Sequence, residues 1–491
     1  MLTALAATGC RRDVLIPDLD ASGPPGSSSS RPSGGSAGVI QRPAGAALVP
    51  PTATPTRVPP ETTATTYTVR AGDTLLRIAG AYGTTVESLM HLNGLADPDR
   101  LAVGQVLKVS MEAENTGPDE RLLPDSELVY GPGYIDYDLA ADIGRHPGLI
   151  SGYTELVDGR ELTAVQIIEL VAEQYSVGPR VLLSLLELRG GWLSDADPAP
   201  AQRQYPLGYD RGVYWQGLYR QLCLAANALN AGAYGWWLDT LWLIQTADGA
   251  FIQLSADLNA GTAGIQKMVA DTSRSYETWL ADLSDFREIY ASLYGPAEDY
   301  AVEPLLPPET ASPELRLPWA EDEVWYYTGG PHPGWGTLGA LSAVDFVTDE
   351  RYIGCAVSQR WVTAVADGLI VVSDDGMVLQ DLDGDGFTGT GWVILYMHIA
   401  GQGRVEAGTQ VEAGDRIGHP SCEGGVSDAS HVHLARRVNG VWVSADDPAY
   451  PMSLSGWVPV AGADHYEGRL LRGDESRTAC ECWESVNAVR H

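Results

Sequence analysis

A segment near the N-terminus that cannot form a core is the feature that most constrains the fold of this chain. Residues 18–65 are dense in Pro, Ser, Gly, Thr and Ala, and they include the run Gly26-Ser27-Ser28-Ser29-Ser30. Such a composition buries too little apolar surface to offset the entropy of ordering the chain. We therefore expect a disordered linker there, and shorter linkers over residues 111–126 and 301–317. The remainder of the 491 residues must fold as separate units.

Acidic residues outnumber basic residues by 64 to 31, which gives the chain a formal charge of −33. A strongly negative protein is repelled by phosphate backbones and by anionic lipid surfaces. The composition therefore predicts no nucleic-acid partner and favours a solvated protein outside the cytoplasm.

Residues 1–17 begin with a short apolar run that ends in small residues before Cys10. This start resembles the end of a truncated bacterial lipoprotein signal, although the usual basic residues do not precede it. The sequence leaves open whether Cys10 carries a lipid anchor, which is the only membrane contact that we expect. The predicted location is extracytoplasmic, either secreted or lipid-anchored at the cell envelope.

Six cysteines are too few for a disulfide-stapled scaffold in a chain of this length. In an oxidising compartment, Cys355 and Cys422 could join two loops of the C-terminal region. Spacing alone does not assign the connectivity.

Residues 66–110 show the pattern of a small mixed domain. An alternating strand at Tyr67-Thr68-Val69 leads through Gly72-Asp73-Thr74 into two short helices, and Asn93 ends the second helix before a closing strand. This pattern resembles the LysM domain, and the resemblance implies a βααβ fold that binds glycans containing N-acetylglucosamine, such as peptidoglycan. The implied glycan-binding residues are Gly72, Asp73, Thr74 and Asn93. The alternative is the same fold without glycan affinity.

Residues 127–300 carry helical periodicity and predict an all-helical domain. The segment that ends at Glu187, together with residues 258–263, loosely resembles the lysozyme-like fold of lytic transglycosylases. That resemblance implies that Glu187 is a glycosidase acid in an apolar setting. Leu188 follows where the family has serine, so we favour the alternative of a helix-end glutamate in a structural or glycan-holding domain.

From residue 318 to residue 455 the pattern changes to short alternating strands separated by glycine-rich turns, which predicts a mainly antiparallel β domain. Residues 456–491 form a C-terminal extension without an assigned role. The fold class predicted for the whole chain is therefore multidomain α+β.

The β region contains residues that suit a metal site. His431 and His433 alternate along a predicted strand, so their side chains share one face, and Asp345 and His398 lie on earlier strands. The ordered motifs over about residues 335–437 resemble the lysostaphin/LytM family of zinc endopeptidases. The resemblance implies that Asp345 and His433 hold Zn²⁺, that His398 and His431 are catalytic, and that peptidoglycan peptides are cleaved.

One expected metal ligand is missing, because Leu341 stands where the family has histidine. Leucine has no electron pair to donate, so the site has either lost its high affinity for metal or found another ligand. His332, in a glycine-rich loop, is the better candidate, and His419 is a poorer one. Three alternatives stay open: an active zinc peptidase, a degenerate wall-binding adaptor or hydrolase activator, and an unrelated β structure.

Asp381, Asp383 and Asp385 alternate before Gly386, as in a calcium loop. Position twelve of this loop is Trp392, so a full EF-hand is excluded. A weak Ca²⁺ site and a plain acidic turn are the two alternatives.

Overall fold

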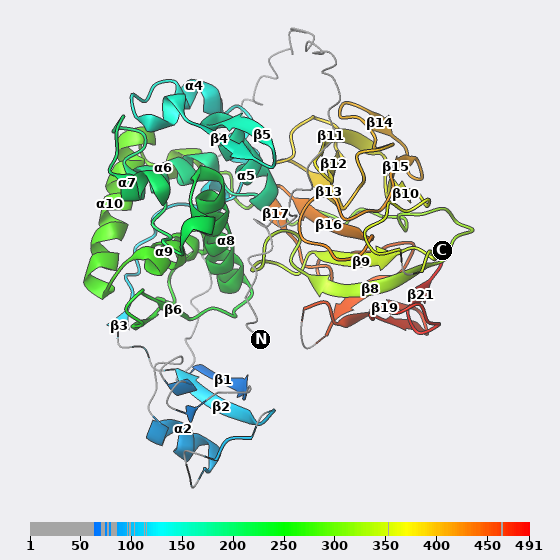
Figure 1. Ribbon diagram of the computed structural model, residues 1–491, viewed down its shortest axis with the longest axis horizontal. Helices are drawn as coiled ribbons and strands as arrows, with labels where there is room; N and C mark the ends of the chain where they lie inside the picture. Colours follow the sequence, from blue (N-terminus) through cyan, green and yellow to red (C-terminus); the bar gives the residue numbers. More distant parts are fainter. Residues whose placement is uncertain are drawn as a thin grey trace, which may run out of the picture.

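The computed structural model describes residues 63–69, 74–75, 78–79, 86–95, 97, 100–102, 104–111, 113, 115–351, 353–462 and 465–491. Cys10, Gly72 and Asp73 lie outside these residues, so the predictions made for them are not addressed by the structure. The predicted multidomain α+β class is confirmed (Figure 1).

The first domain is built on a two-stranded antiparallel sheet of β1 (Thr63–Thr68) and β2 (Val106–Met111). Helix α2 (Val86–Asn93) packs on this sheet through Leu89, which contacts a small core that includes Ile78 and Leu107. Leu107 and Val109 alternate with polar residues along β2 and supply its buried face.

The middle domain is mainly helical. Its long helices are α5 (Ala164–Tyr175), α6 (Pro179–Gly190), α8 (Leu218–Trp237), α9 (Ala260–Thr272) and α10 (Tyr276–Tyr294), and its short ones are α3 (Asp125–Leu128), α4 (Leu139–Ile143) and α7 (Pro200–Gln204). Thr163 and Gln166 form a capping box that starts α5.

The middle domain also contains strands, which helical periodicity did not predict. The hairpin of β4 (Thr154–Val157) and β5 (Arg160–Thr163) precedes α5, and a second small sheet has the order β3 (Asn115–Thr116), β7 (Phe251–Gln253) and β6 (Leu243–Gln245). Each is only two to four residues long, too short for its alternation to be read from sequence.

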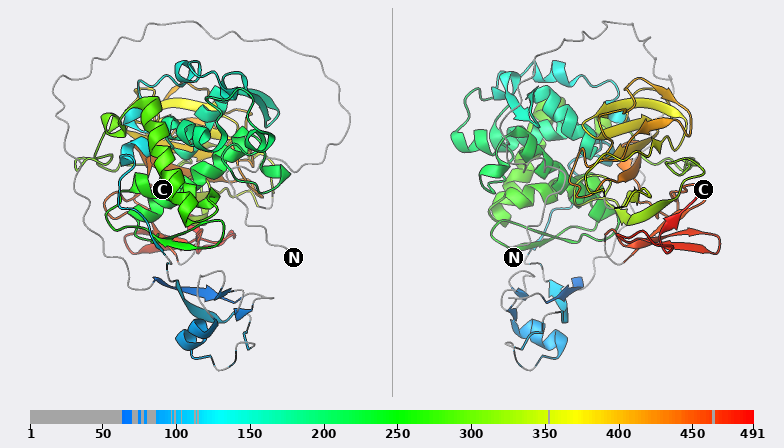
Figure 2. Two further views of the ribbon diagram at one scale, coloured as in Figure 1. Left: turned by 90° about the vertical axis from the view of Figure 1, so that its left-hand side faces the viewer. Right: turned by 45° about the vertical axis from the view of Figure 1, so that its right-hand side comes forward.

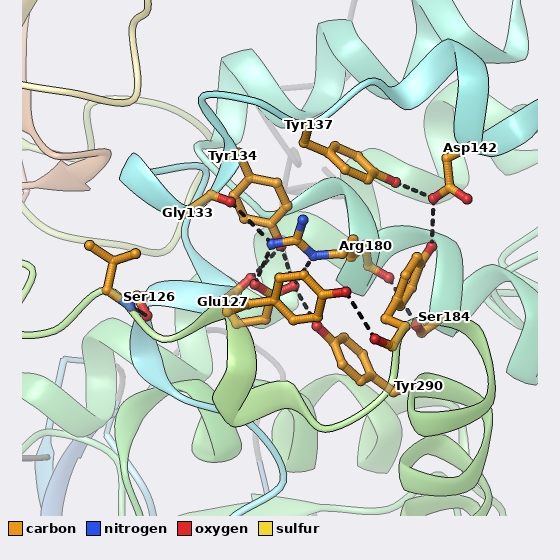
Figure 3. A network of polar contacts seen from close by, with 12 residues as sticks. Ser126, Glu127, Gly133, Tyr134, Tyr137, Asp142, Arg180, Ser184 and Tyr290 are labelled. Carbon is orange, nitrogen blue, oxygen red and sulfur yellow. Dashed lines mark hydrogen bonds and ion pairs between the residues drawn. The ribbon is translucent and has the colours of Figure 1, made fainter. Parts of the chain in front are cut away.

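A buried ion pair stands at the centre of the middle domain (Figure 3). The Arg180 guanidinium donates two hydrogen bonds of 2.7 Å to the Glu127 carboxylate. The hydroxyls of Tyr134 and Tyr290 each donate to Glu127 Oε1 at 2.7 Å, so the carboxylate is satisfied without water. Such a network holds α3 and α6 in one arrangement.

The C-terminal domain is dominated by one antiparallel sheet with the order β14-β11-β12-β13-β16-β9-β8-β21, and β17 also pairs with β16. The strands are β8 (Trp325–His332), β9 (Ala343–Val347), β11 (Gly368–Asp374), β12 (Met377–Asp381), β13 (Trp392–Met397), β14 (Gln410–Val411), β16 (Val432–Val438), β17 (Val441–Trp442) and β21 (Ala488–Val489).

Two smaller sheets flank the main one. They are the pair β10 (Val362–Thr363) and β15 (Arg416–Gly418), and the three-stranded sheet β18 (Val458–Ala461), β19 (Gly468–Arg472) and β20 (Glu475–Thr478). The C-terminal extension therefore folds with the β domain, and its last strand, β21, pairs with β8.

The helical domain packs against one side of the β domain, as Figure 1 and the right-hand view of Figure 2 show. Val129, Tyr234 and Leu305 share a buried cluster with residues of the sheet such as Leu395 and Ala435. Next to this cluster, Arg437 of β16 donates to the Glu173 carbonyl at 2.7 Å and pairs with the Glu173 carboxylate. The two domains therefore share a buried interface cluster, in addition to the core that each domain has of its own.

Among the described residues, none of the helices is long and apolar enough to cross a membrane.

Candidate metal centre and its cleft

Three neighbouring strands of the main sheet bring the candidate metal ligands together. His433 of β16 pairs directly with Asp345 of β9, and Asp345 pairs on its other side with Gly329 of β8. Two irregularities in the β8 register bring His332 to the same place at the end of the strand. His332 therefore lies next to Asp345 and His433, where a residue that replaces the missing ligand at Leu341 would have to lie.

The ligand atoms of His332, Asp345 and His433 all lie within 4.8 Å of one another. Asp345 Oδ1 is 3.3 Å from His332 Nε2 and 3.2 Å from His433 Nδ1, and the two ring nitrogens are 2.9 Å apart. Asp345 Oδ1 is buried, and it has no hydrogen-bond partner in the part of the chain that the structure describes. Two imidazoles and a carboxylate with an unused buried oxygen are a donor set that fits Zn²⁺.

Backbone carbonyls fix the orientation of both histidines of this cluster, His332 and His433. His332 Nδ1 lies 2.8 Å from the Gly330 carbonyl, and His433 Nε2 lies 3.0 Å from the Gly334 carbonyl. With the proton on these nitrogens, each ring donates to a carbonyl and turns its other nitrogen toward Asp345 with a lone pair free.

His398 and His431 stand beside the cluster, with ring centroids 4.4 Å apart. His431 Nδ1 lies 2.8 Å from the Ala429 carbonyl, and its Nε2 lies 3.8 Å from Asp345 Oδ1. His398 Nδ1 lies 3.1 Å from the Glu423 carbonyl. His398 also has a φ of 66°, a left-handed conformation that non-glycine residues adopt at a cost and that is common at functional sites.

The ionisation states in the cluster suit metal binding. Burial would raise the pKa of Asp345, but the adjacent imidazoles of His332 and His431 hold that pKa well below its usual range. Burial lowers the pKa of His433, and burial together with His431 and His433 lowers the pKa of His398 well below its usual range. An anionic Asp345 and a neutral His433 are the forms that metal ligation requires of these two residues.

The glycine pair before His332 is needed for the close approach of the strands. A Cβ atom on Gly329 would lie 2.4 Å from Asp345 Oδ2, and one on Gly330 would lie 2.2 Å from the Glu467 carbonyl. Neither distance is compatible with non-bonded contact, so a larger residue at either position would displace Asp345 or the β18–β19 turn.

The cluster lies in a cleft of about 670 Å³. The C-terminal extension lines part of this cleft with Tyr466, Glu481 and Trp483, which the sequence did not indicate as site residues. The Tyr466 ring stacks on His332 with centroids 4.1 Å apart, and its carbonyl accepts a 2.7 Å hydrogen bond from Gly330 N–H. The close pair Cys480 and Cys482 was the one local sign that this segment has a defined structure.

The disulfide between Cys355 and Cys422 is present, as is one between Cys480 and Cys482. Cys422 directly precedes Glu423, whose carbonyl faces His398. The first disulfide therefore anchors the loop that orients a candidate catalytic histidine.

Other residues singled out in the sequence lie elsewhere. Leu341 is not part of the cluster of candidate ligands. Its backbone carbonyl accepts a hydrogen bond from the Ala445 N–H. His419 packs against Trp361 with ring centroids 3.8 Å apart, and it does not join the cluster of His332, Asp345 and His433.

Glu187 does not lie in the apolar setting that an acid role requires. Its carboxylate accepts hydrogen bonds from Leu193 N–H at 2.8 Å and from Ser194 N–H at 3.2 Å, and the Ser194 hydroxyl also donates to it. These hydrogen bonds close the turn after α6. The glycosidase role of Glu187 stays an untested prediction.

In the first domain, Asn93 is occupied by internal contacts. Its side-chain amide exchanges hydrogen bonds of 2.6 Å with both backbone groups of Lys108, and it also donates to the Leu89 carbonyl. Thr74 accepts from Ile78 N–H through its carbonyl. Asn93 therefore ties α2 to β2, and glycan binding by Thr74 and Asn93 stays a prediction.

The carboxylates of Asp381, Asp383 and Asp385 also lie within 4.8 Å of one another. Asp381 Oδ2 accepts from Gly386 N–H at 2.9 Å, and burial followed by the Asp381 charge raises the pKa of Asp383 to about 6. These contacts are those of an acidic turn, and calcium binding stays a prediction.

The fold and the cluster together describe a small α/β module joined, through a mainly helical domain, to a β domain that contains a cluster of two histidines and an aspartate. Comparison with known families agrees with this organisation. The LysM domain family matches residues 67–110, and the family described as "LasA, N-terminal domain" matches residues 121–307.

Among individual relatives, protease LasA of Pseudomonas aeruginosa (strain UCBPP-PA14) is 22% identical over 349 residues, which cover 67% of this chain and 76% of that protein. N-acetylmuramoyl-L-alanine amidase XlyA of Bacillus subtilis is 47% identical over 60 residues, 12% of this chain and 20% of that one. The probable endopeptidase p60 of Listeria seeligeri is 56% identical over 48 residues, 10% of this chain. The chain thus spans a fifth or less of the length of these last two relatives.

Among solved structures, the M23 metalloprotease pseudoalterin matches with a TM-score of 0.30 and 23% identity, covering 37% of this chain and all of that one. The catalytic domain of lysostaphin from Staphylococcus simulans matches with a TM-score of 0.19 and 25% identity, over 26% of this chain and 95% of that one.

Proposed function

We propose that this chain is a zinc-dependent endopeptidase that acts on peptidoglycan peptides. The observation that carries the proposal is the convergence of His332, Asp345 and His433, with an unused buried carboxylate oxygen at their centre. When bound there, Zn²⁺ would lower the pKa of a water molecule and polarise a peptide carbonyl.

The other two histidines are suited to move protons near that centre. His431 Nε2 faces the cluster, while its Nδ1 is held by the Ala429 carbonyl, so a neutral His431 can accept a proton at Nε2. The Glu423 carbonyl holds His398 Nδ1 in the same way, so a neutral His398 also has its lone pair at Nε2. It can accept a proton there and then give that proton to a leaving amine.

Peptidoglycan as the substrate is supported by the LysM match and by the wall amidase among the relatives. A glycan-binding module on the same chain would raise the local concentration of stem peptides around the cleft. An extracytoplasmic location fits this substrate, and the disulfides fit an oxidising compartment. Lipidation of Cys10 stays a prediction.

The alternative is a wall-binding adaptor or hydrolase activator without catalysis. It was suggested by Leu341 at a ligand position, and His332 now supplies a donor to the cluster that Leu341 cannot.

Zinc content of the purified full chain tests the proposal. The wild type should hold one Zn²⁺ per chain, and the variants His332→Ala and His433→Ala should lose it together with the release of new amino groups from purified peptidoglycan. His419→Ala, a histidine outside the cluster, should retain both metal and activity. A wild type that binds zinc but releases no amino groups from peptidoglycan would leave the adaptor as the better assignment.

A further inference from the structure

The charge of the cleft is one-sided. Its lining contains neither Lys nor Arg among the described residues, but it contains two carboxylates besides Asp345, those of Asp428 and Glu481. Both side chains are exposed, and neither makes a hydrogen bond or ion pair with another described residue. The cleft therefore presents negative charge that the protein itself does not neutralise.

Glu481 is held in a rigid loop. The disulfide between Cys480 and Cys482 brackets it, and the Asn487 side-chain amide donates to the carbonyls of both cysteines, at 3.1 Å and 2.8 Å. Next to it, the Trp483 indole N–H donates to the Thr348 carbonyl at 2.9 Å. A carboxylate on a fixed backbone loses little entropy when it meets a ligand.

Aromatic surfaces accompany these carboxylates, since Trp335, Tyr466 and Trp483 line the same cleft. The faces of aromatic rings attract cations, and the methylene groups next to an amine pack well against them. The chain has 64 acidic and only 31 basic residues, and its negative charge also favours the approach of a cationic ligand.

We propose that the cleft contains a subsite for a protonated amine of the peptide substrate, with Glu481 as its principal acceptor and Asp428 as a second one. This inference deepens the proposed peptidase function and rests on it for the identity of the substrate. The ammonium group belongs either to the free N-terminus of a peptide or to the side chain of a diamino residue, and the two share the same chemistry.

The test uses the full chain and pairs of soluble muropeptides that are identical except for acetylation of their amines, which removes the positive charge. Cleavage is followed with zinc present, and binding is followed by tryptophan fluorescence with zinc omitted. We expect the wild type to favour the native muropeptide by about three- to tenfold in both kcat/KM and affinity, as for a partly exposed ion pair. The preference should shrink when the salt concentration is raised.

The variants Glu481→Gln and Asp428→Asn should each reduce this preference, Glu481→Gln more strongly. Asp474→Asn is the matched control, because Asp474 is an exposed carboxylate of the same extension in the β19–β20 turn and does not line the cleft. Synthetic peptides acetylated only at the N-terminus or only on a side chain then identify which amine is recognised.

Equal binding and equal cleavage of native and acetylated muropeptides would overturn the subsite, even if the chain proves to be a peptidase. A preference in binding without cleavage of either muropeptide would support the subsite and overturn the peptidase proposal. A preference that Glu481→Gln and Asp428→Asn leave unchanged would place the recognition elsewhere and contradict the inference.

Discussion

At the scale of single residues, the candidate metal centre depends on a glycine that has no side chain to contribute. Gly329 pairs with Asp345 across two strands, and the space that its Cβ would occupy is already filled by the Asp345 carboxylate. Only glycine therefore fits at this position without moving Asp345, even though the position contributes no side chain to the cluster.

Replacement of Gly329 by alanine should consequently displace Asp345. We expect Gly329→Ala to weaken zinc binding by at least about tenfold and to lower the free energy of unfolding by about 1–3 kcal/mol, as overpacking does. Zinc titration and denaturant unfolding measure the two effects. Gly152→Ala is the control, because a Cβ on Gly152 meets nothing within 4 Å, and it should change neither quantity noticeably.

Asp125 gives a prediction on pH. Burial raises the pKa of this carboxyl to about 6, although the hydrogen bond that the Gly261 amide donates to it acts in the opposite direction. A carboxyl whose pKa is raised in the folded state contributes stability below its unfolded pKa of about 4, and the contribution is lost as the pH rises through about 6.

The unfolding free energy of the wild type, relative to that of Asp125→Asn, should therefore decrease between pH 4.5 and pH 7.5, because asparagine cannot ionise. The change in their difference in unfolding free energy is expected to be on the order of 2 kcal/mol, measured by urea unfolding at both pH values. A difference that is independent of pH would show that Asp125 ionises normally.

The residues of the centre differed in how far sequence could predict them. Alternation along a strand placed His431 and His433 on one face, and the requirement for a third donor suggested His332. Tyr466 and Glu481 could not be predicted, because they reach the cleft from a segment whose position is set by the pairing of β21 with β8. Such long-range pairing leaves little local signal.

At the scale of elements, the candidate metal ligands and the backbone group that orients His398 lie on different segments. The candidate ligands lie on β8, β9 and β16, whereas the Glu423 carbonyl that orients His398 lies on a loop held by the Cys355–Cys422 disulfide.

Removal of this disulfide in Cys355→Ser/Cys422→Ser should lower peptidase activity and retain zinc. The unfolding free energy should fall by about 2–4 kcal/mol, since the bridge joins residues 67 positions apart. The Cys480–Cys482 disulfide closes a far shorter loop, so Cys480→Ser/Cys482→Ser should lower the unfolding free energy by less. Loss of zinc in the first variant would show that the loop also shapes the ligands.

The acidic turn after β12 gives a prediction on metal addition. If Asp381, Asp383 and Asp385 bind Ca²⁺, calcium at about 100 times its dissociation constant should add about 2.7 kcal/mol of stability and raise Tm by several degrees. Differential scanning calorimetry with Ca²⁺ or Mg²⁺ measures this. Asp385→Asn should abolish the rise, and a wild type insensitive to Ca²⁺ would identify a plain acidic turn.

At the scale of the whole molecule, the helical and β domains are joined by a buried ion pair. Arg437 is 1% exposed, and Glu173 satisfies it with both its carboxylate and its carbonyl. The folding units could be predicted from the change of periodicity along the chain, but this contact could not, because neither residue differs from an ordinary surface charge in sequence.

Glu173→Ala should leave the Arg437 guanidinium buried with less compensation, and we expect a loss of about 3–5 kcal/mol. Calorimetry should then resolve separate transitions for the two domains. The double variant Glu173→Leu/Arg437→Met, which removes both charges, should recover much of the loss and restore a single transition. A single transition in Glu173→Ala would mean that apolar contacts alone couple the domains.

The interface cluster also bears on any attempt to produce the β domain without the helical domain. Leu395, Ala435 and Trp442 are buried against residues of the helical domain, so excision of residues 318–491 would turn part of the sheet into an apolar outer surface. Such a patch promotes self-association. A soluble minimal enzyme would need polar replacements on that face, or it would have to carry the helical domain with it.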